Sequence, residues 1–155
     1  MIMSRFKKIL PGLLIVLIAI QFVRPARNRN DQKQPADLAT ICTVPDTVQG
    51  ILQNACYDCH SNNTNYPWYA NIQPLAWIMA RHITKGKAQL NFSEFGIISK
   101  RKQISKLREM INQVKDDEMP LASYQLMHGN AKSSANKKTL LLNWLTSTAD
   151  SLQNQ

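Results

Sequence analysis

Two cysteines and a histidine lie close together in the run Cys56-Tyr57-Asp58-Cys59-His60. Cys-x-x-Cys-His is the attachment pattern of c-type haem. The spacing has a chemical reason, because the two thiols add to the two porphyrin vinyl groups and the next residue then lies under the ring. Its imidazole can bind the iron as the proximal ligand. We therefore predict one covalent haem c on Cys56 and Cys59, with His60 on the iron.

Two other chemistries use paired cysteines. A thioredoxin-type dithiol follows a strand in a βαβ context, whereas residues 50–55 read as a helix that leads directly into Cys56. A zinc site needs four ligands in a tetrahedron, and the adjacent Cys59 and His60 do not readily share one metal. The other candidate ligands have no partner at zinc-ligand spacing: Cys42, His82 and His128. Haem is therefore the better interpretation.

The formal net charge of +9 is unevenly distributed along the 155 residues. Residues 1–30 hold six basic side chains and no acidic one, and the rest holds 13 basic and 10 acidic side chains, a balance of +3. The excess flanks an apolar run, as at a membrane boundary. The modest charge of the remaining chain gives no strong nucleic-acid footprint, so we expect no nucleic-acid partner. The third cysteine, Cys42, is interpreted as a free or buried thiol, with an intermolecular disulfide as the alternative.

Residues 9–23 are the most apolar stretch and indicate a membrane segment. Counted from Phe6, the helix would span about 27 Å, close to the roughly 30 Å hydrocarbon core of a bilayer. No A-x-A-like cleavage site follows, and Arg24 and Arg27 suit a retained anchor better than a cleaved signal peptide, which is the alternative. We predict a single-pass anchor over residues 1–24. Because covalent haem is attached outside the cytoplasm, the haem domain should lie in the periplasm, at the cytoplasmic membrane.

The rest of the chain reads as a polar tether over residues 25–45 and one haem domain over residues 46–150. Apolar residues at helical spacing predict an all-α, cytochrome-c-like fold of four or five helices. The first predicted helix starts at Pro45, with Asp46 or Thr47 as its cap, and leads into the motif. Further helices are predicted at residues 74–83, 102–115 and about 134–148, with a short one at 121–127. We expect Gly86 to end the second helix and Ser93 to cap a short helix that follows.

The loop after the haem motif mixes polar turn formers with aromatic residues. Trp68 or Tyr69 would cover the porphyrin, since a largely apolar cofactor needs apolar walls; the alternative is a loop packed by its own aromatic side chains. The second imidazole nitrogen of His60 also needs a hydrogen-bond acceptor. A backbone carbonyl near Pro67 or Pro74 is the expected acceptor.

Small helical cytochromes pair the proximal histidine with a methionine from a late loop, often followed by proline. Met119-Pro120 looks like that arrangement, because it falls between two predicted helices and outside the apolar stripe of residues 102–115. Met110 belongs to this apolar stripe, so we assign it to helix packing. The rival ligands are Met127, which is spaced like a core residue, and the two remaining histidines, His82 and His128.

Four runs resemble the bacterial haem-binding domain family, a group of short, N-terminally anchored, extracytoplasmic c-type haem proteins. They are residues 56–64, 66–69, 90–93 and 119–121. The likeness covers about residues 46–146. It implies that Cys56 and Cys59 hold haem, that His60 is the proximal iron ligand and that Met119 is the distal one. Unlike in mainstream cytochromes, the helix before the motif has no aromatic residue to pack on the C-terminal helix.

This ligand set predicts a monohaem c-type cytochrome, not an enzyme, that transfers one electron to and from redox proteins met transiently. His60 and Met119 would saturate the iron and raise its reduction potential. The alternative is a haem-based gas or redox sensor, or a peroxidase-like enzyme, in which Met119 is absent from the iron or displaceable. A thiol module without haem is the remaining interpretation.

The Cys-x-x-Cys-His motif predicts that the matured protein keeps one haem after denaturation, because thioether bonds survive unfolding. Cys56→Ala combined with Cys59→Ala should remove the covalent link, as measured by mass spectrometry of the denatured chain. A wild-type chain produced in a host competent for c-type haem attachment, yet free of haem, would contradict the covalent-haem interpretation.

Overall fold

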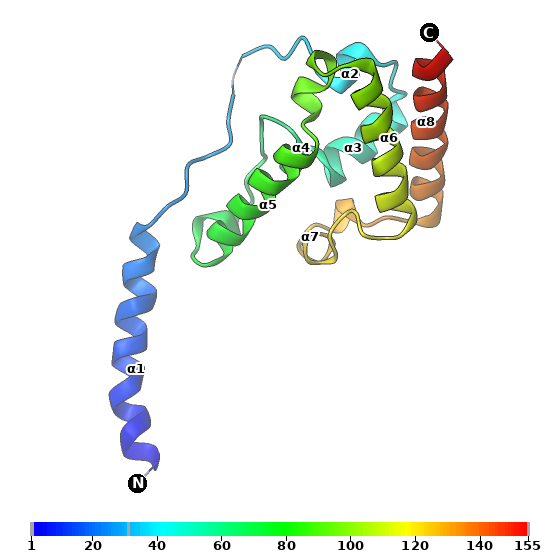
Figure 1. Ribbon diagram of the computed structural model, residues 1–155. Helices are drawn as coiled ribbons and strands as arrows, with labels where there is room; N and C mark the ends of the chain where they lie inside the picture. The colour runs from blue at the N-terminus through cyan, green and yellow to red at the C-terminus, as the bar shows by residue number, and fades with distance from the viewer. Residues whose placement is uncertain (1, 31, 155) are drawn as a thin grey trace.

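The computed structural model describes residues 2–30 and 32–154 (Figure 1). No β-strand occurs within these ranges, so the predicted all-α fold class is confirmed. The helices are α1 (Ile2–Ala19), α2 (Leu38–Ile41), α3 (Asp46–Ala55), α4 (Tyr57–His60), α5 (Leu75–Gln89), α6 (Lys100–Lys115), α7 (Ala122–Met127) and α8 (Ala135–Asn154). Short 3₁₀ helices lie at η1 (Ile20–Phe22), η2 (Trp68–Asn71), η3 (Phe92–Ile97) and η4 (Gly129–Ala131).

Helix α1 stands apart from the other helices, which gather into one body (Figure 1). It contains the apolar run, and the large apolar side chains from Ile9 to Ile18 are exposed. Over the part of the chain that the structure describes, no helix combines the length and the apolarity needed to cross a membrane. The helix is therefore present, and the anchor over residues 1–24 stays a prediction.

The core of the body lies where α3, α6 and α8 meet. Helices α6 and α8 run side by side (Figure 1), and α3 packs across α8. Leu52, Leu107 and Leu145, one from each helix, are almost fully buried in a single cluster. The aromatic residue that α3 lacks is supplied by α8, whose Trp144 joins this cluster and donates its indole N–H to the carbonyl of Thr43 at 3.0 Å. Helix α3, which precedes the motif, therefore does pack on the C-terminal helix α8.

The segment between α1 and α3 also contacts the body. Gln21 accepts a hydrogen bond from the backbone N–H of Gln73 at 2.9 Å. Asn28 donates its side-chain amide to the carbonyl of Ser61 at 2.9 Å. Further on, Leu38 of α2 and Cys42 belong to the buried core, as the interpretation of Cys42 as a buried thiol predicts.

Two predicted helix ends and one predicted cap are wrong. Helix α8 continues to Asn154, beyond the predicted end at 148. Helix α5 does not end at Gly86 but continues to Gln89. The short helix after it is capped by Asn91, whose side-chain oxygen accepts from the backbone N–H of Ser93 at 3.2 Å, so Ser93 is not the cap. An asparagine one residue before the helix satisfies a free N–H of its first turn, as N-cap residues do.

Gly86 has a packing role instead. A Cβ at this position would lie 2.6 Å from the carbonyl oxygen of Cys59, closer than atoms of two residues approach. Helix α5 packs against α4 at this point. The absence of a side chain at Gly86 therefore lets α5 approach the backbone of the Cys-x-x-Cys-His turn.

We expect Gly86→Ala to lower the free energy of unfolding by about 1–3 kcal/mol, because overpacking against backbone forces the two helices apart. Gly50→Ala is the matched control, since Gly50 lies inside α3 with nothing within 4 Å of a Cβ. That change should stabilise by roughly 0.5–1 kcal/mol through helix propensity. Urea unfolding measures both, and equal effects of the two substitutions would contradict the close-approach account.

Candidate functional site

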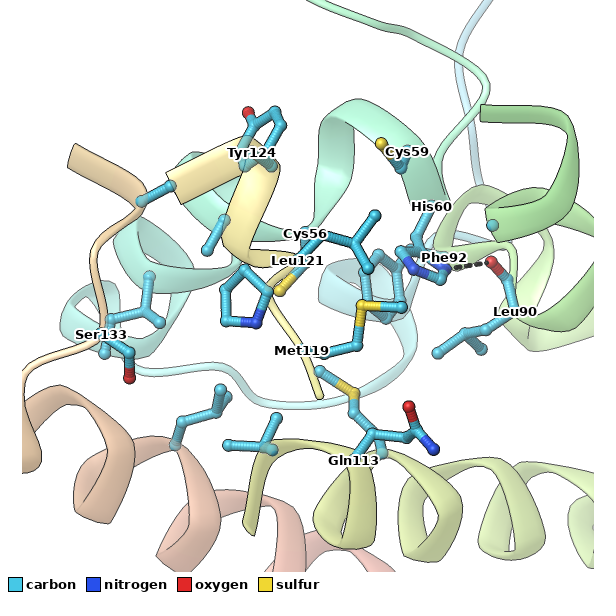
Figure 2. Close-up of a pocket in the computed structure, with 18 of the residues that line it drawn as sticks. Cys56, Cys59, His60, Leu90, Phe92, Gln113, Met119, Leu121, Tyr124 and Ser133 are labelled. Carbon is cyan, nitrogen blue, oxygen red and sulfur yellow. Dashed lines mark hydrogen bonds between the residues drawn. The ribbon is translucent and has the colours of Figure 1, made fainter. Parts of the chain in front are cut away.

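A cavity of about 550 Å³ opens between α4, α5, α6 and the segment that leads into α7. Its volume lies within the range of roughly 300–1,000 Å³ typical of pockets for organic ligands. Figure 2 shows the side chains of Cys56, His60 and Met119 around it. The apolar lining includes Ile51, Leu90, Phe92, Met110, Val114, Leu121 and Leu141. All four predicted haem-binding residues, Cys59 among them, therefore line one largely apolar cavity.

The Cys-x-x-Cys-His motif forms a single helical turn at the end of α3. The backbone N–H of Cys56 donates to the carbonyl of Leu52 at 2.9 Å, which continues the helical pattern of α3 into the motif. The N–H groups of Cys59 and His60 then both donate to the carbonyl of Cys56, at 3.2 and 3.0 Å. This turn brings both thiols and the imidazole to the same cavity.

The imidazole of His60 is oriented by a backbone carbonyl. Its Nδ1 lies 2.9 Å from the oxygen of Leu90, drawn as a dashed line in Figure 2, so the expected acceptor near Pro67 or Pro74 is wrong. Because a carbonyl only accepts, Nδ1 carries the proton and the lone pair of Nε2 is available to a metal. Burial lowers the pKa of His60, and hydrogen bonding to the backbone of Leu90 and of Gly86 opposes that effect only in part. The neutral imidazole is the form that binds iron.

The residues around Leu90 bind the loop that follows the motif. The side-chain amide of Asn91 donates to the side chain of Asn62 at 2.9 Å, and the backbone N–H of Asn62 donates to the hydroxyl of Ser93 at 3.1 Å. Both hydrogen bonds hold Asn62, two residues after His60, against the segment that begins with Leu90, whose carbonyl accepts from His60. The sequence analysis gave residues 90–93 only as a run that resembles the family and Ser93 as a helix cap, and it missed this role, although asparagine and serine occur in both runs.

The end of α6 places Met119. Asp117 adopts a left-handed backbone with φ of 58°. The N–H of Glu118 donates to Gln113 at 3.0 Å and the N–H of Asp117 to Val114 at 3.3 Å, which is the Schellman ending of a helix. The N–H of Met119 also donates to the Gln113 carbonyl, at 3.1 Å. The chain therefore reverses at the helix end and delivers Met119 to the cavity.

A lysine of α8 holds this turn. The ammonium of Lys138 lies 2.6 Å from the carboxylate of Asp117 and donates to the carbonyl of Lys115 at 2.9 Å. A cation at this place complements the negative end of the α6 dipole. The ion pair also gives a reason for an aspartate where glycine is the usual residue.

The expected aromatic wall is not made by Trp68 or Tyr69. Trp68 is 70% exposed, and neither side chain is among the described residues that line the cavity. Tyr69 packs instead with Ala70 and with Met79 and Ile83 of α5 in a second small cluster. The alternative of a loop packed by its own aromatic residues holds only in part, through the edge-on contact of Trp68 with Tyr69 at 5.9 Å. Phe92 and Tyr124 are the aromatic residues of the cavity wall.

The rival iron ligands are placed differently from one another. His82 lines the cavity from inside α5, whereas Met127 and His128 are not among its lining residues. Met127 is 49% exposed, so its predicted core position is wrong. Met110, which the sequence analysis assigned only to the helix stripe, also lines the cavity, and its place there was missed, as were those of Phe92 and Tyr124.

The donor set fits haem better than the other metal or thiol chemistries. Burial raises the pKa of Cys56 to about 12 and that of Cys59 to about 11, so both thiols are protonated at neutral pH. A redox dithiol of the thioredoxin type depends on a lowered thiol pKa. Within residues 2–30 and 32–154 no cluster of three or more metal-binding side chains occurs. An apolar cavity with two protonated thiols, a free imidazole nitrogen and thioether sulfur is suited to a covalent porphyrin.

Comparison with known proteins gives one match. The model of a protein family described as a haem-binding domain matches residues 15–147. This range includes every residue that lines the cavity. No curated protein and no solved structure matches the chain.

Proposed function

The chain belongs to the haem-binding domain family, and we propose that it is a monohaem c-type cytochrome that transfers single electrons at the outer face of the cytoplasmic membrane. The observation that carries the proposal is the arrangement of His60 in the cavity. Its Nδ1 is bonded to Leu90, its Nε2 is available, and a methionine faces the same space. The packing of α3 on α8 also supports a cytochrome-c-like arrangement.

Each residue has a separate task in this proposal. Cys56 and Cys59 would hold the porphyrin edge through thioethers, so that the cofactor is retained in both redox states. His60, oriented by the Leu90 carbonyl, would bind the iron on one side and Met119 on the other. When bound, haem supplies a reversible one-electron change at iron. If His60 and Met119 both hold the iron, no position would remain on it for a substrate, which is why we propose electron transfer and not catalysis.

The cavity walls would favour the reduced state. Apolar side chains of the lining would limit the access of water to the iron, and methionine ligation would raise the reduction potential relative to two histidines. Four lysines also line the cavity: Lys85, Lys106, Lys132 and Lys137. The only carboxylate among the lining residues is Glu109, which pairs with Lys106 at 2.6 Å. This positive excess supports transient partners with an acidic surface, such as other redox proteins.

A membrane location is part of the proposal. The exposed apolar side chains of α1 would face lipid, with the haem body on the periplasmic side. Hydrogen bonds of the Val23 carbonyl with Gln73 at 2.8 Å and with Trp77 at 2.9 Å keep the body next to the end of this helix. The proposed anchor would therefore hold the cytochrome close to the bilayer surface.

We expect the intact protein to fractionate with membranes and to keep its N-terminal 23 residues, because no cleavage site follows the apolar run. Cell fractionation followed by N-terminal sequencing measures this. A mature chain that begins after Val23 in a soluble periplasmic fraction would refute the anchor and leave the haem proposal intact.

Met119 is expected to be the sixth iron ligand, and Met110 provides the matched control because both methionines line the cavity. Leucine keeps the volume of methionine and removes the sulfur. Met119→Leu should abolish the weak near-infrared charge-transfer band of methionine-bound ferric haem, lower the reduction potential and let the reduced protein bind carbon monoxide. Met110→Leu should leave all three unchanged.

The opposite pattern would make Met110 the ligand. Unchanged spectra in both variants would move the ligand elsewhere, with His82 next to be tested. A wild-type reduced protein that binds carbon monoxide readily would favour the sensor or peroxidase-like alternative over electron transfer.

A further inference from the structure

One hydrogen bond joins the haem motif to the segment that runs from Met119 into α7, and it has no part in the function proposed above. The hydroxyl of Tyr124 donates to the Oδ2 atom of Asp58 at 2.6 Å. Asp58 lies between the two motif cysteines, and Tyr124 lies in α7, five residues after Met119. Both side chains are half-buried, and Tyr124 lines the cavity. The bond therefore connects the proximal and distal sides of the site directly.

The carboxylate of Asp58 is held in place by its own neighbours. Its Oδ1 atom accepts from the backbone N–H of Asn65 at 2.9 Å, and its carbonyl accepts from the hydroxyl of Thr64 at 2.6 Å. These bonds fix the orientation of the side chain and leave Oδ2 for Tyr124. A hydrogen bond to an ionised acceptor is shorter and stronger than one between neutral groups.

The phenol ring of Tyr124 is also oriented. It stacks on the ring of His128, with centroids 3.9 Å apart and planes at 18°. His128 in turn meets the ring of Tyr69 edge-on at 5.8 Å. The stack holds the ring on the side of α7 from which its hydroxyl reaches Asp58.

Helix α7 has few other attachments that would hold it closed. None of its residues, Ala122 to Met127, is buried. Elements with little buried apolar surface open at low free-energy cost. The segment before α7 is fixed at its start, by the helix ending at Asp117 and the Lys138 ion pair. After α7 the chain is held again, because η4 packs against α3 and its Ala131 is buried. Between these two supports, the hydrogen bond of Tyr124 to Asp58 joins α7 to the haem motif.

We propose that the Asp58–Tyr124 hydrogen bond is a latch that keeps the Met119 segment closed over the haem and so limits the access of small neutral ligands to the sixth position of the iron. Tyr124 is then a positioning residue that acts through Asp58 and does not touch the iron. The inference rests on the proposed function, in which Met119 binds the iron.

The test measures the rate at which carbon monoxide binds to the reduced, haem-loaded full chain. Tyr124→Phe keeps the ring and removes the hydroxyl, and should raise the rate about tenfold or more, since hydrogen bonds to charged groups are worth at least that factor. Asp58→Asn should raise it less, because the amide oxygen still accepts. The double variant should be no faster than Tyr124→Phe alone, because the second change removes nothing further.

Tyr66→Phe is the matched control. Its hydroxyl also makes a hydrogen bond, accepting from the backbone N–H of Asn28 at 2.7 Å, but it does not line the cavity. This variant should bind carbon monoxide at the wild-type rate. All variants should keep the near-infrared methionine band at rest, because the latch limits opening and does not supply the ligand.

Two results would overturn the latch. One is an unchanged rate in Tyr124→Phe while Met119→Leu binds carbon monoxide freely. The other is an equal increase in Tyr66→Phe, or additive effects in the double variant, which would indicate general loosening. Failure of the ligand assignment is seen separately, because Met119→Leu would then leave both the band and the carbon monoxide rate unchanged.

Discussion

The 2.9 Å contact between Nδ1 of His60 and the carbonyl of Leu90 is the constraint on which the rest of the site depends. It fixes the position of the proton on the imidazole and therefore which nitrogen can bind iron. The contact joins residues 30 positions apart, so α5 must pack against the motif turn at a set distance. Gly86 permits that distance, because any side chain there would meet the Cys59 carbonyl. The orientation of His60 therefore depends on its hydrogen bond to Leu90, and that bond depends on the close packing of α5 on α4 at Gly86.

The distal side is built by a different device. A Schellman ending at Asp117 reverses the chain after α6, and Lys138 of α8 pairs with the same residue. Since α6 and α8 also pack along their length, the position of Met119 follows from the core of the body and not from a free loop. The two sides of the cavity therefore rest on separate supports, α5 for the histidine and the α6–α8 pair for the methionine. The bond of Tyr124 to Asp58 is the direct polar connection between them.

Haem chemistry needs this combination of apolar walls and a few oriented polar groups. Apolar side chains cover the cavity, while the polar residues that orient the ligands lie behind it: Asn62, Asn91 and Ser93 bond one another and the loop after the motif. Buried polar groups require such partners, because an unpaired one costs free energy. The runs that resemble the haem-binding domain family thus have structural reasons: residues 90–93 supply the acceptor of His60 and the bonds to Asn62.

The sequence by itself determined the features that depend on neighbouring residues. Cys56, Cys59 and His60 are readable because the covalent chemistry needs that spacing, and α3, α6 and α8 because one apolar face repeats at helical spacing. Met119 could be proposed as a ligand because a proline follows it and because it lies outside the apolar stripe. Only the tertiary structure decided the acceptor of His60, the place of Met110 in the cavity, the exposure of Trp68 and Met127, and the bond between Asp58 and Tyr124. The physical reason is that each of these depends on contacts between segments far apart in the chain, which the packing of whole helices sets and no local pattern records.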